Sequence, residues 1–138
     1  MVLLGVDFGD VRVGFARCDK DELLATGLET VNVAGVRDAA KKTALKAAEI
    51  GAEKIVVGKP LRTDGSAGDR VEKTLAFVQM LSDLVQIPVE TFDERFTSVC
   101  AHQYLSGSGL KTKKHKGLVD TVSAAIILQD YMDRHKNR

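Results

Sequence analysis

The hydrophobic pattern at the start of the chain predicts three successive β-strands. Residues Val2–Phe8 are apolar except for Asp7, and Val13–Cys18 form a second apolar run after a polar stretch of turn length. Two such runs joined by a short turn predict an antiparallel hairpin. Residues Leu23–Val33 are rich in β-branched and aliphatic side chains, which favours a third strand. Within it, Gly27 indicates a bulge or bend near the start.

The rest of the chain alternates helical and strand patterns. We expect helices over Val36–Ile50, Asp69–Val85, Thr97–Leu105 and Leu118–Met132, strands over Ile55–Val57 and Val89–Phe92, and a basic flexible loop over Gly107–Gly117. Gly51 stands where a left-handed helix cap belongs. Strands separated by helices pair in parallel through crossovers. The order therefore predicts one α/β domain over residues 1–138. Its mixed five-stranded sheet has three antiparallel meander strands, then two parallel strands, and is flanked by helices.

Composition narrows the class of protein. Hydrophobic residues make up 44% and charged residues 28% of the 138 positions, which excludes a disordered chain or a coiled coil. The net charge of +1 means that nucleic-acid binding would need a local basic patch. Cys18 and Cys100 lie far apart without a Cys-x-x-Cys partner, which argues against a disulfide framework or a zinc site. With no membrane-length apolar run and no signal peptide, we expect a cytoplasmic protein without membrane contact.

Acidic residues stand where apolar ones would be expected. Asp7 interrupts an apolar strand, Asp120 lies on the apolar stripe of the last helix, and Asp93-Glu94-Arg95 follow a strand directly. Carboxylates that converge from separate elements repel one another unless a cation lies between them. Oxygen ligands favour Mg²⁺ or Mn²⁺, and a pair of such ions can activate water against a phosphodiester. The alternative is structural: a turn cap at Asp7, a helix-dipole charge at Asp120 and a local ion pair at Asp93–Arg95.

Four segments that carry these acids resemble, in order and spacing, the motifs of the YqgF/RuvX family. They are VDFGDVRVGFARCD (Val6 to Asp19), VVGKPLRTDGSAG (Val56 to Gly68), DERFTS (Asp93 to Ser98) and VDTVSAAIILQDYM (Val119 to Met132). The resemblance spans nearly the whole chain. It implies a ribonuclease H-like fold related to the RuvC Holliday-junction resolvases, and a role as a nuclease that matures the small-subunit ribosomal RNA precursor.

The same resemblance implies a set of metal ligands for two Mg²⁺ or Mn²⁺ ions. Asp7 would be the first-strand ligand, Asp120 the last-helix ligand, and Glu94 the third carboxylate. The chain departs from many ribonuclease H-like nucleases because the strand at Ile55–Pro60 carries no acid. Strand alternation puts Asp93 and Glu94 on opposite sides, so one of them faces the metal. We favour Glu94, with Asp93 either supporting the metal ligands or pairing with Arg95.

Basic residues gather near the last of these acids. Residues Lys111–Arg138 hold seven Lys or Arg against three acids. Contacts with phosphate would position a nucleic acid without reading its sequence, whereas the alternative is a solvated loop. The candidates for nucleic-acid binding are Arg12, Arg95, Lys111, Lys113, Lys114 and Lys116. The three histidines share no metal-ligand spacing.

The favoured function is a metal-dependent nuclease acting on structured nucleic acid, with precursor ribosomal RNA as the substrate and ribosomal particles as possible partners. A Holliday junction resolvase, acting on branched DNA as a dimer, is the nearest alternative. A non-catalytic RNA-binding assembly factor is another. The turn at Asp7-Phe8-Gly9 also resembles the phosphate-binding turn of sugar-kinase-like ATPases, which use two such domains. The sequence leaves open endo- or exonuclease action and the oligomeric state.

Overall fold

The strands form one five-stranded mixed sheet in the order β3-β2-β1-β4-β5. The computed structural model describes residues 1–9, 11–19, 21, 24–59, 69–93 and 112–136. The strands are β1 (Leu3–Phe8), β2 (Arg12–Cys18), β3 (Ala25–Asn32), β4 (Lys54–Lys59) and β5 (Val89–Asp93). β1, β2 and β3 form an antiparallel meander, and β4 and β5 continue the sheet in parallel with β1. The predicted sheet is confirmed.

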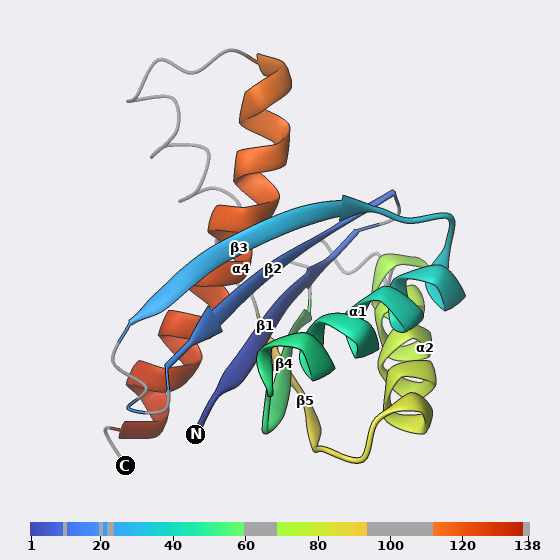
Figure 1. Cartoon of the computed structure of the whole chain (residues 1–138). Helices are drawn as coiled ribbons and strands as arrows, with labels where there is room; N and C mark the ends of the chain where they lie inside the picture. The colour runs from blue at the N-terminus through green and yellow to red at the C-terminus, as the bar shows by residue number, and fades with distance from the viewer. Residues whose placement is uncertain (10, 20, 22–23, 60–68, 94–111, 137–138) are drawn as a thin grey trace.

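Helices cover both faces of this sheet (Figure 1). They are α1 (Val36–Ile50), α2 (Asp69–Leu84) and α4 (Thr112–Lys136). Because β1 is buried along its whole length, its side chains supply two cores in alternation. Leu4, Val6 and Phe8 pack with α1 and α2, whereas Leu3 packs on the α4 face. The central strand is therefore apolar on both sides, and Asp7 is its single charge.

Two glycines act as the sequence predicts. Gly51 ends α1 in the left-handed conformation, with φ 69° and ψ 38°, and backbone N–H groups there bond the carbonyls of Ala47 and Ala48. In β3 the register shifts opposite Phe15 and Ala16, beside Gly27, so the predicted bulge is confirmed. α4 packs against this edge strand and also against β2 and β1.

The last helix is longer than its apolar pattern predicts. α4 begins at Thr112, so the flexible loop expected over Gly107–Gly117 is wrong for its second half. Lysine is a good helix former, and one internal glycine costs only about 1 kcal/mol, so the packed part of α4 sustains these extra turns. Residues 107–111 and the helix expected over Thr97–Leu105 lie outside the described residues. None of the helices in the described part of the chain is long and apolar enough to cross a membrane.

Candidate active site

Asp7 lies on the face of the sheet that α4 covers. Leu3 belongs to the core under α4, and alternation along the strand places Gly5 and Asp7 on the same face. The Asp7 residue is only 8% exposed. Burying a carboxylate is costly unless it has partners or binds a cation, so its place in an otherwise apolar strand is a functional signal.

Glycines flank Asp7 on both neighbouring strands. Gly14 of β2 stands directly opposite Asp7 in the antiparallel register. On the other side, Gly58 of β4 follows the last residue that pairs with β1, and it pairs in turn with Phe92 of β5. The described strand positions directly beside Asp7 on this face are therefore glycines, which carry no side chain. Arg12 begins β2 two positions before Gly14, so it lies on the same face at the same end of the sheet.

α4 approaches β1 very closely, which brings Asp120 to the same end of the sheet. A Cβ added to Gly5 would lie 2.8 Å from the Cβ of Leu128 and 3.0 Å from the carbonyl oxygen of Ala124. Asp120 is one helical turn before Ala124, on the same face of α4. From Gly5, Asp7 lies two residues further toward the end of β1. By backbone position, Asp7 and Asp120 therefore both lie toward the same end of the sheet.

A polar cluster anchors the other end of α4. The Tyr131 hydroxyl donates a 2.6 Å hydrogen bond to Glu90 and accepts one of 3.1 Å from the Lys54 ammonium, which also bonds Glu90 at 3.2 Å. The hydrogen bond with Tyr131 raises the pKa of Lys54, and burial, followed by the bond to Glu90, raises the pKa of Tyr131. Phe92 meets the Tyr131 ring edge-on at 5.8 Å. These contacts set the position of α4 over β4 and β5.

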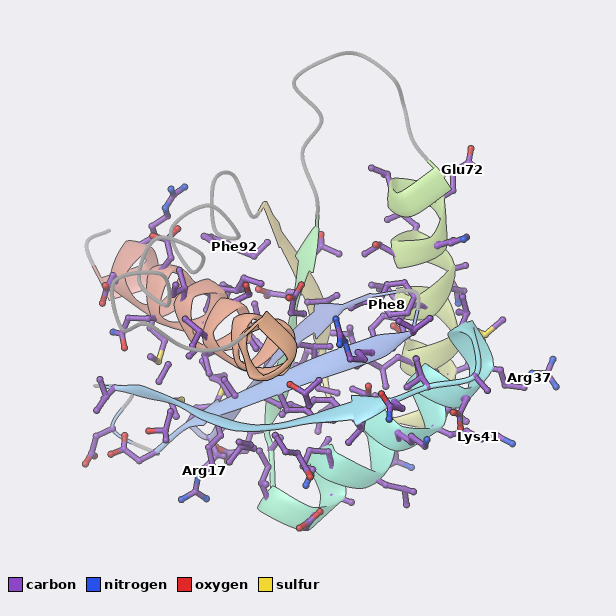
Figure 2. All side chains as sticks on the ribbon, turned by 90° about the horizontal axis from the view of Figure 1, so that it is seen from above. Phe8, Arg17, Arg37, Lys41, Glu72 and Phe92 are labelled. Carbon is purple, nitrogen blue, oxygen red and sulfur yellow. The ribbon has the colours of Figure 1, made fainter. Side chains whose placement is uncertain are left out.

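Strand alternation along β5 bears on which of Asp93 and Glu94 faces the proposed site. Phe92 lies on the α4 side of the sheet, whereas Phe8 lies on the α2 side and stacks on Phe77 (Figure 2). Asp93 is the last residue of β5 and pairs with Lys59 of β4. Continued strand alternation predicts the α2 side for this position. Glu94 lies outside the described residues.

The structure describes some of the candidate basic residues of the sequence and not others. Lys113, Lys114 and Lys116 belong to the first turns of α4, which extend past the sheet (Figure 1), and not to a loop. Arg95 and Lys111 lie outside the described residues.

The structure tests only part of the predicted constellation. It describes the side chain of Asp7 and the backbone positions of Asp93 and Asp120. Within the described residues, no group of three or more His, Cys, Asp or Glu is arranged to hold a metal ion. Convergence of Asp7, Glu94 and Asp120 therefore stays a prediction.

Sequence reasoning missed two features of this region. The first is the glycine pair beside Asp7, which becomes visible only once the strands are aligned. The second is Ser123, a buried serine three residues after Asp120, which stands among buried Ala, Ile, Leu and Met residues of α4. That polar exception was present in the sequence as a signal. The Tyr131–Glu90 contact joins residues far apart in the chain and has no such signal.

Comparison with known proteins gives consistent results. The sequence profile described as "RuvX: Holliday junction resolvase" matches residues 1–134. A protein of Ruminiclostridium cellulolyticum named "Putative pre-16S rRNA nuclease" is 42% identical, over 97% of this chain and 95% of that protein. A protein of the same name from Chloroflexus aurantiacus is 40% identical, over 99% of this chain and 89% of that protein.

Solved structures support the fold. Thermus thermophilus RuvC in complex with a Holliday junction substrate has a TM-score of 0.64 at 17% identity, covering 99% of this chain and 96% of that one. The fowlpox virus resolvase, in a complex with Holliday junction DNA, has a TM-score of 0.61 at 14% identity, covering 98% and 99%. These similarities confirm the predicted ribonuclease H-like fold.

Proposed function

The chain belongs to the RuvX Holliday junction resolvase family, and from this membership we propose that residues 1–138 form a single nuclease domain that hydrolyses phosphodiester bonds in structured nucleic acid. The preferred substrate in this proposal is the cytoplasmic precursor of 16S ribosomal RNA, as the names of the relatives suggest. The observation that carries the proposal is Asp7, a buried carboxylate on the central strand, two residues beyond Gly5, where α4 packs closely on β1.

Asp7 is suited to a divalent cation. Its carboxylate is buried, and the positions beside it on β2 and β4 are Gly14 and Gly58, so no neighbouring strand side chain occupies that part of the face. We propose that Asp7, Glu94 and Asp120 hold two Mg²⁺ or Mn²⁺ ions, which are the ions that oxygen ligands favour. Bound there, such ions would stabilise negative charge on the phosphate and promote attack by water.

The assignment of Glu94 over Asp93 rests on the register of β5. Glu90 and Phe92 lie on the α4 face, because both lie against Tyr131. Asp93 falls on the other face, and in an extended chain the next position returns to the α4 face. Asp93 then supports the site from the α2 side.

Basic residues would hold the nucleic acid. Arg12 lies on the Asp7 face at the end of the hairpin, and the first turns of α4 carry lysines beyond the sheet. Their proposed role is to bind phosphate groups and so align the scissile bond with Asp7, which makes binding sensitive to salt. The proposed set is Arg12, Arg95, Lys111, Lys113, Lys114 and Lys116.

Branched DNA is the second candidate substrate, because the family is described as Holliday junction resolvases. Symmetric cleavage of two strands would require two copies of this chain. Cleavage of precursor RNA requires only one, so substrate preference and oligomeric state on the substrate together separate the two functions.

The decisive experiment compares cleavage of a labelled 16S precursor fragment and a four-way DNA junction in Mn²⁺, Mg²⁺ or chelator. We expect metal-dependent cleavage by the wild type. Asp7→Asn should lower the rate more than about 100-fold, since losing a group that merely supports a metal ligand costs about 10- to 100-fold. The matched control is Asp83→Asn, an exposed carboxylate on α2 that should keep full activity. Salt-sensitive RNA binding without cleavage in any metal would contradict the nuclease and indicate an assembly factor.

A further inference from the structure

Ser123 is a buried polar residue for which the described part of the chain provides no hydrogen-bond partner. Ser123 is 1% exposed, and its hydroxyl oxygen makes no hydrogen bond with any of the described residues. A serine inside a helix commonly bonds the carbonyl one turn earlier, which would satisfy it locally. Leaving a buried hydroxyl unpaired costs about 1 to 3 kcal/mol, so such a group calls for a functional explanation.

The position of Ser123 in the helix suggests what satisfies it. Ser123, Ile127 and Tyr131 are spaced by four residues and lie along one side of α4. Tyr131 bonds Glu90 and packs on Phe92, so this side of the helix faces β4 and β5. Eight residues separate the two ends of the row, a distance of about 12 Å along the helix axis.

This distance brings Ser123 toward the end of the sheet that holds Asp7. At Ala124, the next residue, α4 already lies against Gly5 of β1, two positions before Asp7. On the β4 side of Asp7 stands Gly58, which has no side chain to fill the face beneath the helix. The helical spacing therefore places the buried Ser123 near the end of the sheet that holds the buried Asp7.

We propose that Ser123 is a positioning residue for the cation held at Asp7. Its hydroxyl would hydrogen-bond a water molecule bound to that ion and so help to hold the hydrated ion beside Asp7. A serine hydroxyl both donates and accepts, which suits a water molecule between a cation and carboxylates. This role rests on the proposed metal-dependent function, and it explains why a polar group interrupts the buried side of α4.

Metal binding without substrate tests the role directly. Calorimetric titration with Mn²⁺ should give about 10-fold weaker binding for Ser123→Ala than for the wild type, the lower end of the effect seen for groups that support metal ligands. In metal-free buffer Ser123→Ala should melt at the same temperature or higher, because it removes an unsatisfied hydroxyl. Ser123→Cys, similar in size but weak in hydrogen bonding, should show the same loss of Mn²⁺ affinity.

Thr43 provides a matched control. It is the other described residue with a buried, unpaired hydroxyl, but it lies on α1, on the opposite face of the sheet. Thr43→Val should leave Mn²⁺ affinity unchanged. If Ser123→Ala and Ser123→Cys bind Mn²⁺ like the wild type while Asp7→Asn has lost binding, the metal site stands and the role of Ser123 is refuted. Absence of Mn²⁺ binding by the wild type would refute both proposals.

Discussion

Replacing Gly5 with alanine tests whether the close contact between α4 and β1 sets the geometry of the proposed site. The new Cβ would lie 2.8 Å from the Cβ of Leu128 and 3.0 Å from the carbonyl oxygen of Ala124. Ordinary carbon–carbon contacts are about 3.5 to 4.0 Å, so α4 must withdraw by about 0.7 to 1.2 Å. Overpacking of this kind costs about 1 to 3 kcal/mol of unfolding free energy. For a chain of this size, that corresponds to a melting temperature lower by about 3 to 15 °C.

The effect on catalysis should exceed the effect on folding. α4 carries Asp120 and β1 carries Asp7, and a displacement of about 1 Å in a catalytic arrangement can lower the rate about 100-fold. We therefore expect Gly5→Ala to reduce kcat by about 10- to 100-fold at 20 °C. Circular dichroism at this temperature serves to check that the variant is folded. The measurement is single-turnover cleavage in Mn²⁺ beside a thermal melt.

Gly51→Ala separates stability from geometry. Gly51 has φ 69°, and nothing lies within 4 Å of an added Cβ, so the change costs backbone strain of about 1 to 2 kcal/mol far from α4. It should lower the melting temperature and leave kcat unchanged. If Gly5→Ala loses stability like Gly51→Ala but cleaves at the wild-type rate, the contact of α4 with β1 does not set the site.

Two further predictions concern polar contacts outside the site. Tyr131→Phe removes bonds to Glu90 and Lys54 and should cost about 1 to 2 kcal/mol by urea unfolding at pH 7. Folding raises the pKa of both Lys54 and Tyr131 above their ordinary values of 10.5 and 10.0, so stability falls as the pH rises past these values. Tyr131→Phe should lose less unfolding free energy than the wild type as the pH rises. If the unfolding free energies of the two proteins fall in parallel with pH, this explanation is contradicted. The hydrogen bond from the Ala34 N–H to Asp38, and to a smaller extent the one from Lys42, lower the pKa of Asp38 below 3.8. Asp38→Asn should therefore destabilise the protein at pH 7. That difference should disappear as the pH falls below 3.8 and through the lowered pKa of Asp38; a difference that persists once Asp38 is protonated would refute the charge-based explanation.

The elements of the fold were largely predictable because their signals are local. Apolar runs of strand length, a three-and-four helical spacing and a glycine at a helix end depend on neighbours in the chain. The beginning of α4 was mispredicted because its first turns lack an apolar stripe. They continue a helix that tertiary packing stabilises further along.

The candidate site was predictable only in part. Asp7 and Asp120 attract notice because each is a charge in an apolar element, and this needs no structure to recognise. Ser123 sends a weaker signal, since a serine in a helix usually satisfies itself through a nearby carbonyl. Its significance appears only when the structure shows the hydroxyl buried, with no hydrogen bond to any of the residues that are described.

Hydrophobic periodicity and chain-local geometry were enough to predict the order of the described strands and helices, the apolar character of β1 and the acid within it. Tertiary structure alone decided that Gly14 and Gly58 flank Asp7, that α4 rests against Gly5, and that Tyr131 joins Glu90 and Lys54. The physical reason is that strand register and helix docking bring together residues far apart in the chain. They depend on how whole surfaces fit, which no local pattern encodes.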